Sequence, residues 1–145
     1  MVDVTGKSIT DRSATASGRV VMTRPTRDLI MTGDAPKGDV LGTARVAAIM
    51  AAKKTSELIP LCHPIAIGAI DVELSSIDEG IHISATVRTS DRTGVEMEAL
   101  TAVTVGALTI YDMIKGVERS AHIEAIQLDA KSGGKSGSWS SDAAG

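Results

Sequence analysis

The stretch Gly94 to Arg119 reads GVEMEALTAVTVGALTIYDMIKGVER, and it decides the architecture because it predicts one long, almost wholly apolar helix. At 3.6 residues per turn, its few polar side chains fall on one narrow stripe. A helix that is apolar on nearly every side is buried. Charged groups on it therefore face a pocket or a partner chain, where they must be paired or used. The stripe contains Glu98, Thr101, Val105, Leu108, Asp112 and Lys115.

The segments before this helix alternate apolar and polar side chains and predict strands. Residues 70–75 and 81–88 alternate with a period of two, and Asp78-Glu79-Gly80 between them predicts a hairpin turn. Shorter strands are predicted at 19–23, before this hairpin, and at 123–130, after the long helix. The four strands are expected to pair in one antiparallel sheet.

A second helix is predicted to start at Asp39, whose side chain suits an N-cap, and to run to about Lys54. The element order then predicts an α+β fold: a ferredoxin-like sandwich, with a four-stranded antiparallel sheet and two main helices on one face. The uncovered sheet face and the far side of the long helix are expected to be apolar. Because such surfaces usually meet another subunit, the sequence predicts an oligomer.

The 145 residues are enough for one domain with a substantial core. Residues 1–137 are expected to form that domain, with a loose N-terminal arm over about 1–17. The Gly- and Ser-rich residues 138–145 are expected to be a mobile tail.

Composition excludes several classes of function. A formal net charge of −3, with one Trp, one Tyr and no Phe, argues against general nucleic-acid binding. The single cysteine excludes an internal disulfide and an iron–sulfur cluster held by the chain's own thiolates. No apolar run is expected to reach transmembrane length, and the N-terminus lacks a signal-peptide pattern. We therefore expect a cytoplasmic protein with no membrane partner.

Asp112 and Lys115 are the first candidates for chemistry, because their spacing puts them one helical turn apart. They form either a surface salt bridge of little energetic value or a partly buried acid–base couple, and the spacing favours neither. Lys37 comes just before the helix expected at Asp39, where free backbone N–H groups attract anions. Taken alone, that segment is better explained as an exposed lysine beside a capping aspartate.

His63 lies in the connector before Pro64, which restricts its backbone to extended conformations and suits hydrogen bonding to a phosphate or carbonyl. The alternative is a half-buried loop histidine. Cys62 beside it is more often a small core residue than a nucleophile. Glu96 and Glu98 favour the dipole of the long helix, which by itself explains them. The three histidines lack metal-ligand spacing, so no metal site is expected.

Six motifs along the chain can be compared with known families. They are MVDV (1–4), KGDV (37–40), LIPLCHP (58–64), TGVEMEALTA (93–102), ALTIYDM (107–113) and KSGGKSG (131–137). In this order they closely resemble the cyclic pyranopterin monophosphate synthases, the second enzymes of molybdenum cofactor (molybdopterin) biosynthesis. The resemblance covers nearly the whole chain apart from its last residues.

The resemblance implies a lyase that uses acid/base catalysis. Its substrate would be 3′,8-cyclo-7,8-dihydroguanosine 5′-triphosphate, and its products cyclic pyranopterin monophosphate and pyrophosphate. It implies no resident cofactor, and the sequence does not decide whether Mg²⁺ accompanies the triphosphate. It also implies a homohexamer, a trimer of dimers, with each site at a dimer interface.

The resemblance also implies roles for individual residues. Asp112 would be the active-site acid/base, with Lys115 and Lys37 as its partners in proton transfer. A lysine desolvated beside other cations is expected to have a pKa lowered toward neutrality. The residues that match substrate contacts, the last two of them phosphate contacts, are Leu61, Cys62, His63, Glu96, Met97, Glu98, Arg12 and Lys131.

Two other functions remain open from the residues alone. A nucleotide-sensing module on the same fold would bind an anion but would not need Asp112 and Lys115 in one pocket. A structural oligomerisation domain would leave the polar residues scattered and solvated. The catalytic hypothesis therefore requires two adjoining protomers to bring four side chains together around one anionic cavity. These are Asp112, Lys115, Lys37 and His63.

Overall fold

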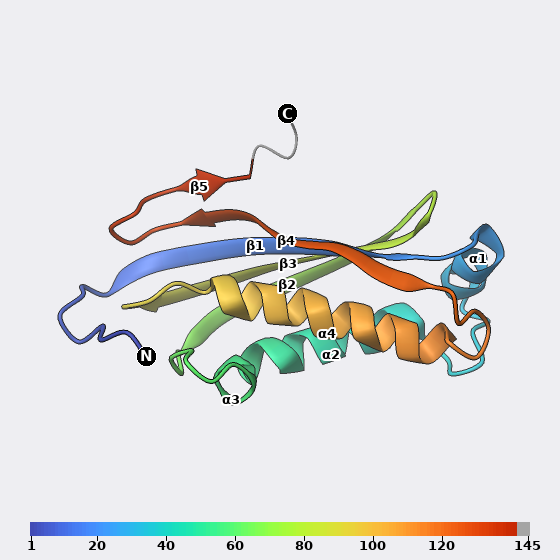
Figure 1. The fold of residues 1–145 in the computed structure, drawn as a ribbon, viewed down its shortest axis with the longest axis horizontal. Helices are drawn as coiled ribbons and strands as arrows, with labels where there is room; N and C mark the ends of the chain where they lie inside the picture. Colours follow the sequence, from blue (N-terminus) through green and yellow to red (C-terminus); the bar gives the residue numbers. More distant parts are fainter. Residues whose placement is uncertain (142–145) are drawn as a thin grey trace.

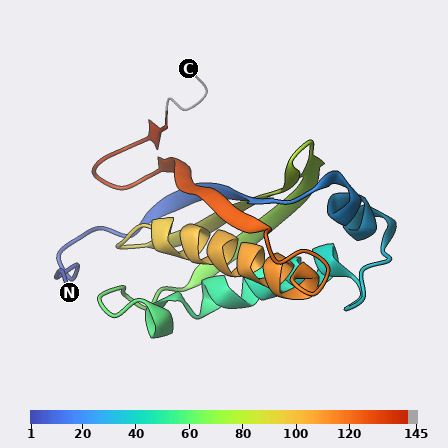
Figure 2. The same cartoon turned by 45° about the vertical axis from the view of Figure 1, so that its right-hand side comes forward.

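The computed structural model describes residues 1–141 and contains one antiparallel sheet with its long helices on one face (Figure 1). The strand order is β2-β3-β1-β4-β5. The two long helices, α2 and α4, lie side by side in both views of the fold (Figures 1 and 2). The elements are β1 (Thr10–Val21), α1 (Arg24–Thr32), α2 (Val40–Lys53), α3 (Thr55–Leu58), β2 (Ile67–Ile77), β3 (Gly80–Asp91), α4 (Glu96–Ile114), β4 (His122–Ser132) and β5 (Trp139–Ser140).

This arrangement confirms the predicted α+β, ferredoxin-like sandwich, with a fifth short strand in addition to the four expected. Helix α4 is the core helix that its composition predicted. Gly106 lets it approach closely, because a Cβ at this position would collide with Ile83 of β3 and press on Ala48 of α2. The predicted cap of α2 is also present, since Asp39 Oδ1 accepts a hydrogen bond from the Gly42 N–H at 2.9 Å.

The expected loose arm over residues 1–17 is wrong in its second half, because β1 begins at Thr10. The inward positions Ala14, Ala16 and Val20 are fully buried. Gly18 continues this face, where a Cβ would press against Ile126 and Val103. These inward residues are too small to give a strong hydrophobic signal, and this concealed the strand.

The expected mobile tail over residues 138–145 is wrong at its start. Trp139 and Ser140 form β5, and they pair with Lys131 and Ala130 of β4. The rest of that segment, 142–145, lies outside the described residues.

The outer face of the sheet is polar, which corrects the expectation of an apolar uncovered face. Hydroxyl groups of Thr15 and Thr86 bond across strands at 2.8 Å. Arg19 forms an ion pair with Glu124 at 2.6 Å on the same outer face of the sheet. The exposed apolar residues near the middle of the two long helices instead lie on the helix side of the molecule: Val46, Met50 and Leu108.

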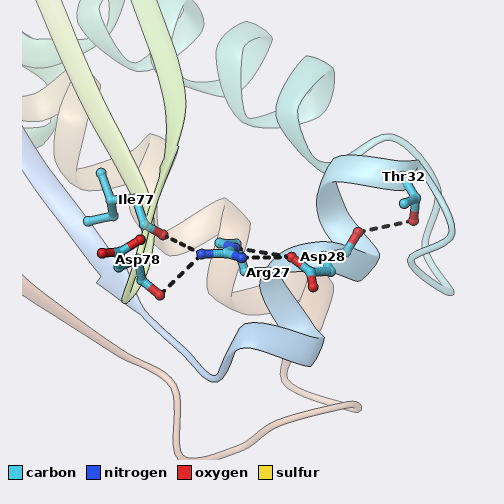
Figure 3. Close-up of polar contacts among 5 residues, drawn as sticks. All are labelled: Arg27, Asp28, Thr32, Ile77 and Asp78. Atoms are coloured by element: carbon cyan, nitrogen blue, oxygen red, sulfur yellow. Dashed lines mark hydrogen bonds and ion pairs between the residues drawn. The ribbon is translucent and has the colours of Figure 1, made fainter.

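Helix α1 is anchored to the turn between β2 and β3 by one arginine (Figure 3). The Arg27 guanidinium donates to the carbonyl oxygens of Ile77 at 3.1 Å and Asp78 at 3.3 Å. It also pairs with Asp28 at 2.9 Å, and the Thr32 hydroxyl bonds the Asp28 carbonyl at 3.0 Å. Helix α1 leads directly into the loop that carries Lys37 and precedes α2.

Helix α4 is long and apolar enough to cross a membrane by length and composition, contrary to the expectation that no run would reach that length. Within the fold, however, 56% of this stretch is buried. Its packing against both α2 and the sheet accounts for its composition as that of a core helix.

Candidate functional site

Three charged side chains meet at the C-terminal end of α4. Asp112 Oδ1 accepts from Lys115 Nζ at 2.6 Å, and Asp112 Oδ2 accepts from Lys37 Nζ at 3.1 Å. Lys115 comes from the next turn of the same helix, whereas Lys37 comes from the loop before α2. Gly38 has a φ of 98°, which lets this loop turn sharply into the cap of α2. One carboxylate therefore holds two ammonium groups.

The charges of this cluster stabilise one another. Hydrogen bonds from Lys115 and then Lys37, together with their positive charges, lower the pKa of Asp112. The hydrogen bond to Asp112 raises the pKa of Lys115. The three side chains are about half exposed, at 51–52%. The expectation of a desolvated lysine with a lowered pKa is therefore wrong for the single protomer, where Lys115 is a stable ammonium.

A second cluster lies at the opposite, N-terminal end of α4. Lys131 Nζ of β4 pairs with Glu96 Oε1 at 2.9 Å, and both side chains are about three-quarters buried. Arg12 of β1 donates to the carbonyl oxygens of Asp91 at 3.0 Å and Arg92 at 3.1 Å. A cavity of about 770 Å³ opens here. Its lining includes Lys7, Thr10, Arg12, Gly94, Glu96, Lys131 and Lys135.

The acid–base state of Glu96 follows from this arrangement. Burial raises its pKa, but the hydrogen bond from Lys131, a backbone hydrogen bond and the charges of Lys131 and Arg12 outweigh burial, so the net pKa is lowered. Glu96 therefore neutralises Lys131 in the free protomer. An incoming phosphate must compete with Glu96 for this lysine.

A neighbouring hollow of about 440 Å³ is lined by Leu61, Cys62, His63 and Met97. The N-terminal arm contributes Val2 and Val4 to the same lining. Four residues expected to contact substrate are therefore together, beside the Glu96 cavity.

Glu98 lies behind this hollow and is only 2% exposed. The Cys62 thiol donates to Glu98 Oε1 at 3.8 Å, while Glu98 Oε2 has no hydrogen-bond partner within residues 1–141. Burial raises the pKa of Glu98, and burial followed by the negative charge of Glu98 raises the pKa of Cys62. Cys62 is thus a thiol, not a thiolate nucleophile, in this protomer. Glu98 Oε2 can therefore still accept a hydrogen bond from a donor on a ligand or on another chain.

The predicted site residues thus form two groups and not one. At a rise of 1.5 Å per residue, Met97 and Asp112 are roughly 22 Å apart along α4. His63 lies at the Met97 end, away from the Asp112 cluster within one protomer. Within one protomer, the length of α4 therefore keeps the two groups apart.

Lys7 and Lys135 are not among the substrate contacts that the resemblance implies, although both line the larger cavity. Lys135 belongs to the KSGGKSG motif, so its position in that motif could have indicated it. Lys7 carries no such signal, because the arm reaches the cavity only through the tertiary fold. Over residues 1–141, no three His, Cys, Asp or Glu side chains are grouped so as to hold a metal ion.

Comparison with known proteins identifies the family to which the chain belongs. The MoaC family matches residues 1–134. The chain is 54% identical over 139 residues to the cyclic pyranopterin monophosphate synthase of Streptomyces coelicolor, covering 96% of this chain and 82% of that protein. It is 58% identical to the same enzyme of Novosphingobium aromaticivorans over 96% of this chain and 88% of that protein. The cyclic pyranopterin monophosphate synthase 3 of Mycobacterium bovis is 59% identical, over 96% of this chain and 79% of that protein. With a family match over nearly its full length and relatives above half identity, the chain belongs to the MoaC family.

Proposed function

We propose that this protein converts 3′,8-cyclo-7,8-dihydroguanosine 5′-triphosphate into cyclic pyranopterin monophosphate and pyrophosphate, as a lyase of molybdenum cofactor biosynthesis. The relatives named as this synthase support the reaction. The observation that carries the proposal is Asp112 held between Lys37 and Lys115, at 3.1 and 2.6 Å. A binding module would have no need for this cluster.

The proposed chemistry is proton transfer. Opening the guanine-derived ring and closing a pterin requires protons to be given and taken repeatedly by positioned groups. Asp112 keeps Lys115 protonated, so the ammonium is ready to donate to a leaving nitrogen or oxygen of the substrate. After Lys115 has given up its proton, a proton can pass from the Lys37 ammonium through the Asp112 carboxylate to the Lys115 amine, and Lys37 is then reprotonated from solvent. This sequence uses the two lysines as donors and the aspartate as their common acceptor.

The cavity at the other end of α4 is proposed to hold the triphosphate. Cyclic phosphate formation with release of pyrophosphate needs cations around the phosphoryl groups as charge develops. Arg12 and Lys131 provide them, and Lys131 would exchange its bond with Glu96 at 2.9 Å for one with the phosphate. We propose no resident metal, and Mg²⁺ would enter only with the triphosphate.

We infer that the complete site forms between two protomers. Glu98 and Asp112 lie equally far along α4 from Val105 and share its stripe. An antiparallel two-fold packing centred near Val105 would therefore place Asp112 of one protomer opposite the partner's Glu98. Leu108, 55% exposed on this stripe, would be covered by the contact. Lys115 or Lys37 could then donate to the unpartnered oxygen of Glu98.

We extend this dimer to a hexamer, a trimer of dimers. A second apolar surface, Val46 and Met50 on α2, faces away from α4 and is more than half exposed. A two-fold contact through α4 would leave this surface open, so further copies can use it. We also place the reaction in the cytoplasm, where nucleoside triphosphates are available.

The test is incubation of the purified protein with the cyclic triphosphate, followed by a pyrophosphate assay and mass spectrometry of the pterin product. We expect stoichiometric pyrophosphate and product from the wild-type protein and neither from Asp112→Asn. Parallel reactions with and without EDTA determine whether Mg²⁺ is required. Saturable binding of the substrate without any turnover would instead identify a nucleotide sensor and reject the proposal.

A further inference from the structure

Trp139 is the cross-strand neighbour of Lys131, which lines the larger cavity. The two residues are directly opposite in the β4–β5 ladder. Opposite residues of an antiparallel pair project from the same face of the sheet. Lys131 projects toward Glu96, at 2.9 Å, and its other cross-strand neighbour Ala14 is buried at 1% exposure. Trp139 therefore lies on the cavity side of the sheet.

The turn between β4 and β5 is held in place by its contacts with β1. Gly133 packs so closely on Asp11 that a Cβ would collide with the Asp11 carbonyl oxygen. A Cβ on Gly134 would likewise collide with the Arg12 guanidinium. Their φ angles of 92° and 73° are in the left-handed region that favours glycine. The turn that leads from Lys131 to Trp139 is therefore held against β1, with Gly134 beside Arg12.

Trp139 is a large aromatic residue that the described residues, 1–141, leave partly exposed. It is 48% exposed, next to a cavity whose lining side chains are mostly polar or charged. Large aromatic rings bury their area in a core or use it in binding. The only other aromatic residue of the chain, Tyr111, lies near the far end of α4, where its hydroxyl donates to the Arg119 carbonyl at 3.0 Å. Of the two, Trp139 is the one that lies next to a residue lining this cavity.

We propose that Trp139 is the stacking platform for the heteroaromatic ring of the substrate, next to the cations that hold its phosphates. This inference rests on the proposed function and adds a binding residue to it. A planar, electron-rich indole attracts the face of a guanine- or pterin-like ring. Lys131, its direct cross-strand neighbour, would hold the phosphate chain of the same molecule. The geometry thus selects ligands that join a flat ring to a polyphosphate.

Steady-state kinetics with the cyclic triphosphate test this proposal. Trp139→Leu keeps the apolar volume but removes the ring, and we expect its KM to rise about tenfold with little change in kcat. Trp139→Phe keeps a ring face and should remain within about threefold of the wild-type KM. Met31→Ala, a change at a similarly exposed apolar residue on α1, at the opposite end of the molecule from β5 (Figure 1), should leave KM unchanged.

Because Trp139 is the only tryptophan, its fluorescence reports on the contact directly. We expect the substrate to quench it, and inorganic tripolyphosphate, which lacks a ring, to leave it nearly unchanged. An unaltered KM in Trp139→Leu, equal rises in the Leu and Phe variants, or equal quenching by tripolyphosphate would each overturn the inference. If the wild-type protein releases no pyrophosphate, the proposed function fails, whereas a failure confined to the Trp139 variants leaves it intact.

Discussion

At the scale of single residues, the cluster around Asp112 determines what chemistry is available. Its carboxylate stays ionised because Lys115 and Lys37 lower its pKa, and Lys115 stays protonated because Asp112 raises the pKa of the amine. The pair therefore holds one charge state throughout the neutral range. Proton transfer from Lys115 must be driven by the substrate and not by the pH of the solvent.

Replacing Lys115 should separate catalysis from folding. Lys115→Ala is expected to reduce turnover by at least about a thousandfold, because the ammonium that donates the proton is lost. Its side chain is 51% exposed, so folding and assembly should be unaffected. Mass spectrometry of the product and analytical ultracentrifugation measure the two effects. Normal product formation by this variant would contradict the role given to Lys115, and Lys54→Ala, an exposed lysine after α2, is the control.

The second residue-scale prediction concerns Cys62. Burial and the negative charge of Glu98 raise the pKa of this thiol, so little thiolate is present at neutral pH. Glu98→Gln removes the charge, which lowers the thiol pKa and should speed alkylation by iodoacetamide about two- to fivefold at pH 8. Glu73→Gln, on the exposed face of β2, is the matched control and should show the wild-type rate. An unchanged rate in Glu98→Gln would mean that the carboxyl is already neutral.

At the scale of elements, a distant carboxylate caps α1. Thr23 precedes this helix but makes no capping bond with its own side chain to the helix backbone, and the first turn has no acidic residue. Glu118, in the segment after α4, accepts from the Thr23 N–H at 3.1 Å and from its hydroxyl at 2.8 Å. The segment that follows Lys115 is thereby joined to the helix that precedes Lys37. Glu118 thus helps to keep both lysines on Asp112.

The stability supplied by Glu118 should depend on pH. Burial raises its pKa, but hydrogen bonds from Thr26 and Thr23 outweigh burial and lower the net pKa. A carboxyl with a lowered pKa stabilises the fold above the ordinary glutamate pKa of about 4.3, and this stabilisation is lost as the pH falls through the folded value. Glu118→Gln should therefore lower the free energy of unfolding at pH 7, by about 0.5 kcal/mol because solvent screens this partly exposed carboxylate.

The difference between wild type and Glu118→Gln should shrink toward zero near pH 3, because the wild-type carboxyl is then neutral as well. Urea denaturation at both pH values measures it. Glu79→Gln, in the exposed β2–β3 turn and without a side-chain hydrogen bond, is the control. A deficit of the same size at both pH values would show that the loss is steric and not electrostatic.

At the scale of the whole molecule, the length of α4 separates the two halves of the site. The Asp112 cluster and the His63 hollow lie near opposite ends of this helix, roughly 22 Å apart. In the proposed dimer, each protomer would therefore carry one half of each of two sites. The proposed antiparallel packing of two α4 helices joins these halves and covers Leu108 in the same contact.

Mixing two inactive variants tests this arrangement. Asp112→Asn and His63→Ala should each have little activity alone. Co-expressed in equal amounts, they should recover about a quarter of the wild-type rate, because random pairing builds that share of sites from two intact halves. Activity is measured per total protein by pyrophosphate release. No recovery in the mixture, at unchanged oligomeric state, would place the whole site within one protomer.

Much of the fold could be predicted from the sequence, because its strongest signals are local. The periodicity of α4, the alternation in β2 and β3 and the Asp39 cap each depend on neighbours in the chain. Strand β1 was predicted too short because its inward positions are alanine and glycine, which bury little area individually. Strand β5 was missed because its two residues are ordered by pairing with β4, which no local pattern encodes.

The same distinction between local and long-range interactions applies to the candidate site. Asp112 and Lys115 are one turn apart, so the sequence by itself determined that they could meet, as it determined the helix that carries them. Only the tertiary structure decided that Lys37 joins them from a distant loop, that Glu98 is buried with an unpartnered oxygen, and that His63 lies at the other end. The physical reason is the distance along the chain over which each interaction acts. Hydrogen-bonded turns and side-chain periodicity involve residues a few positions apart, whereas burial and charge pairing depend on how distant segments pack.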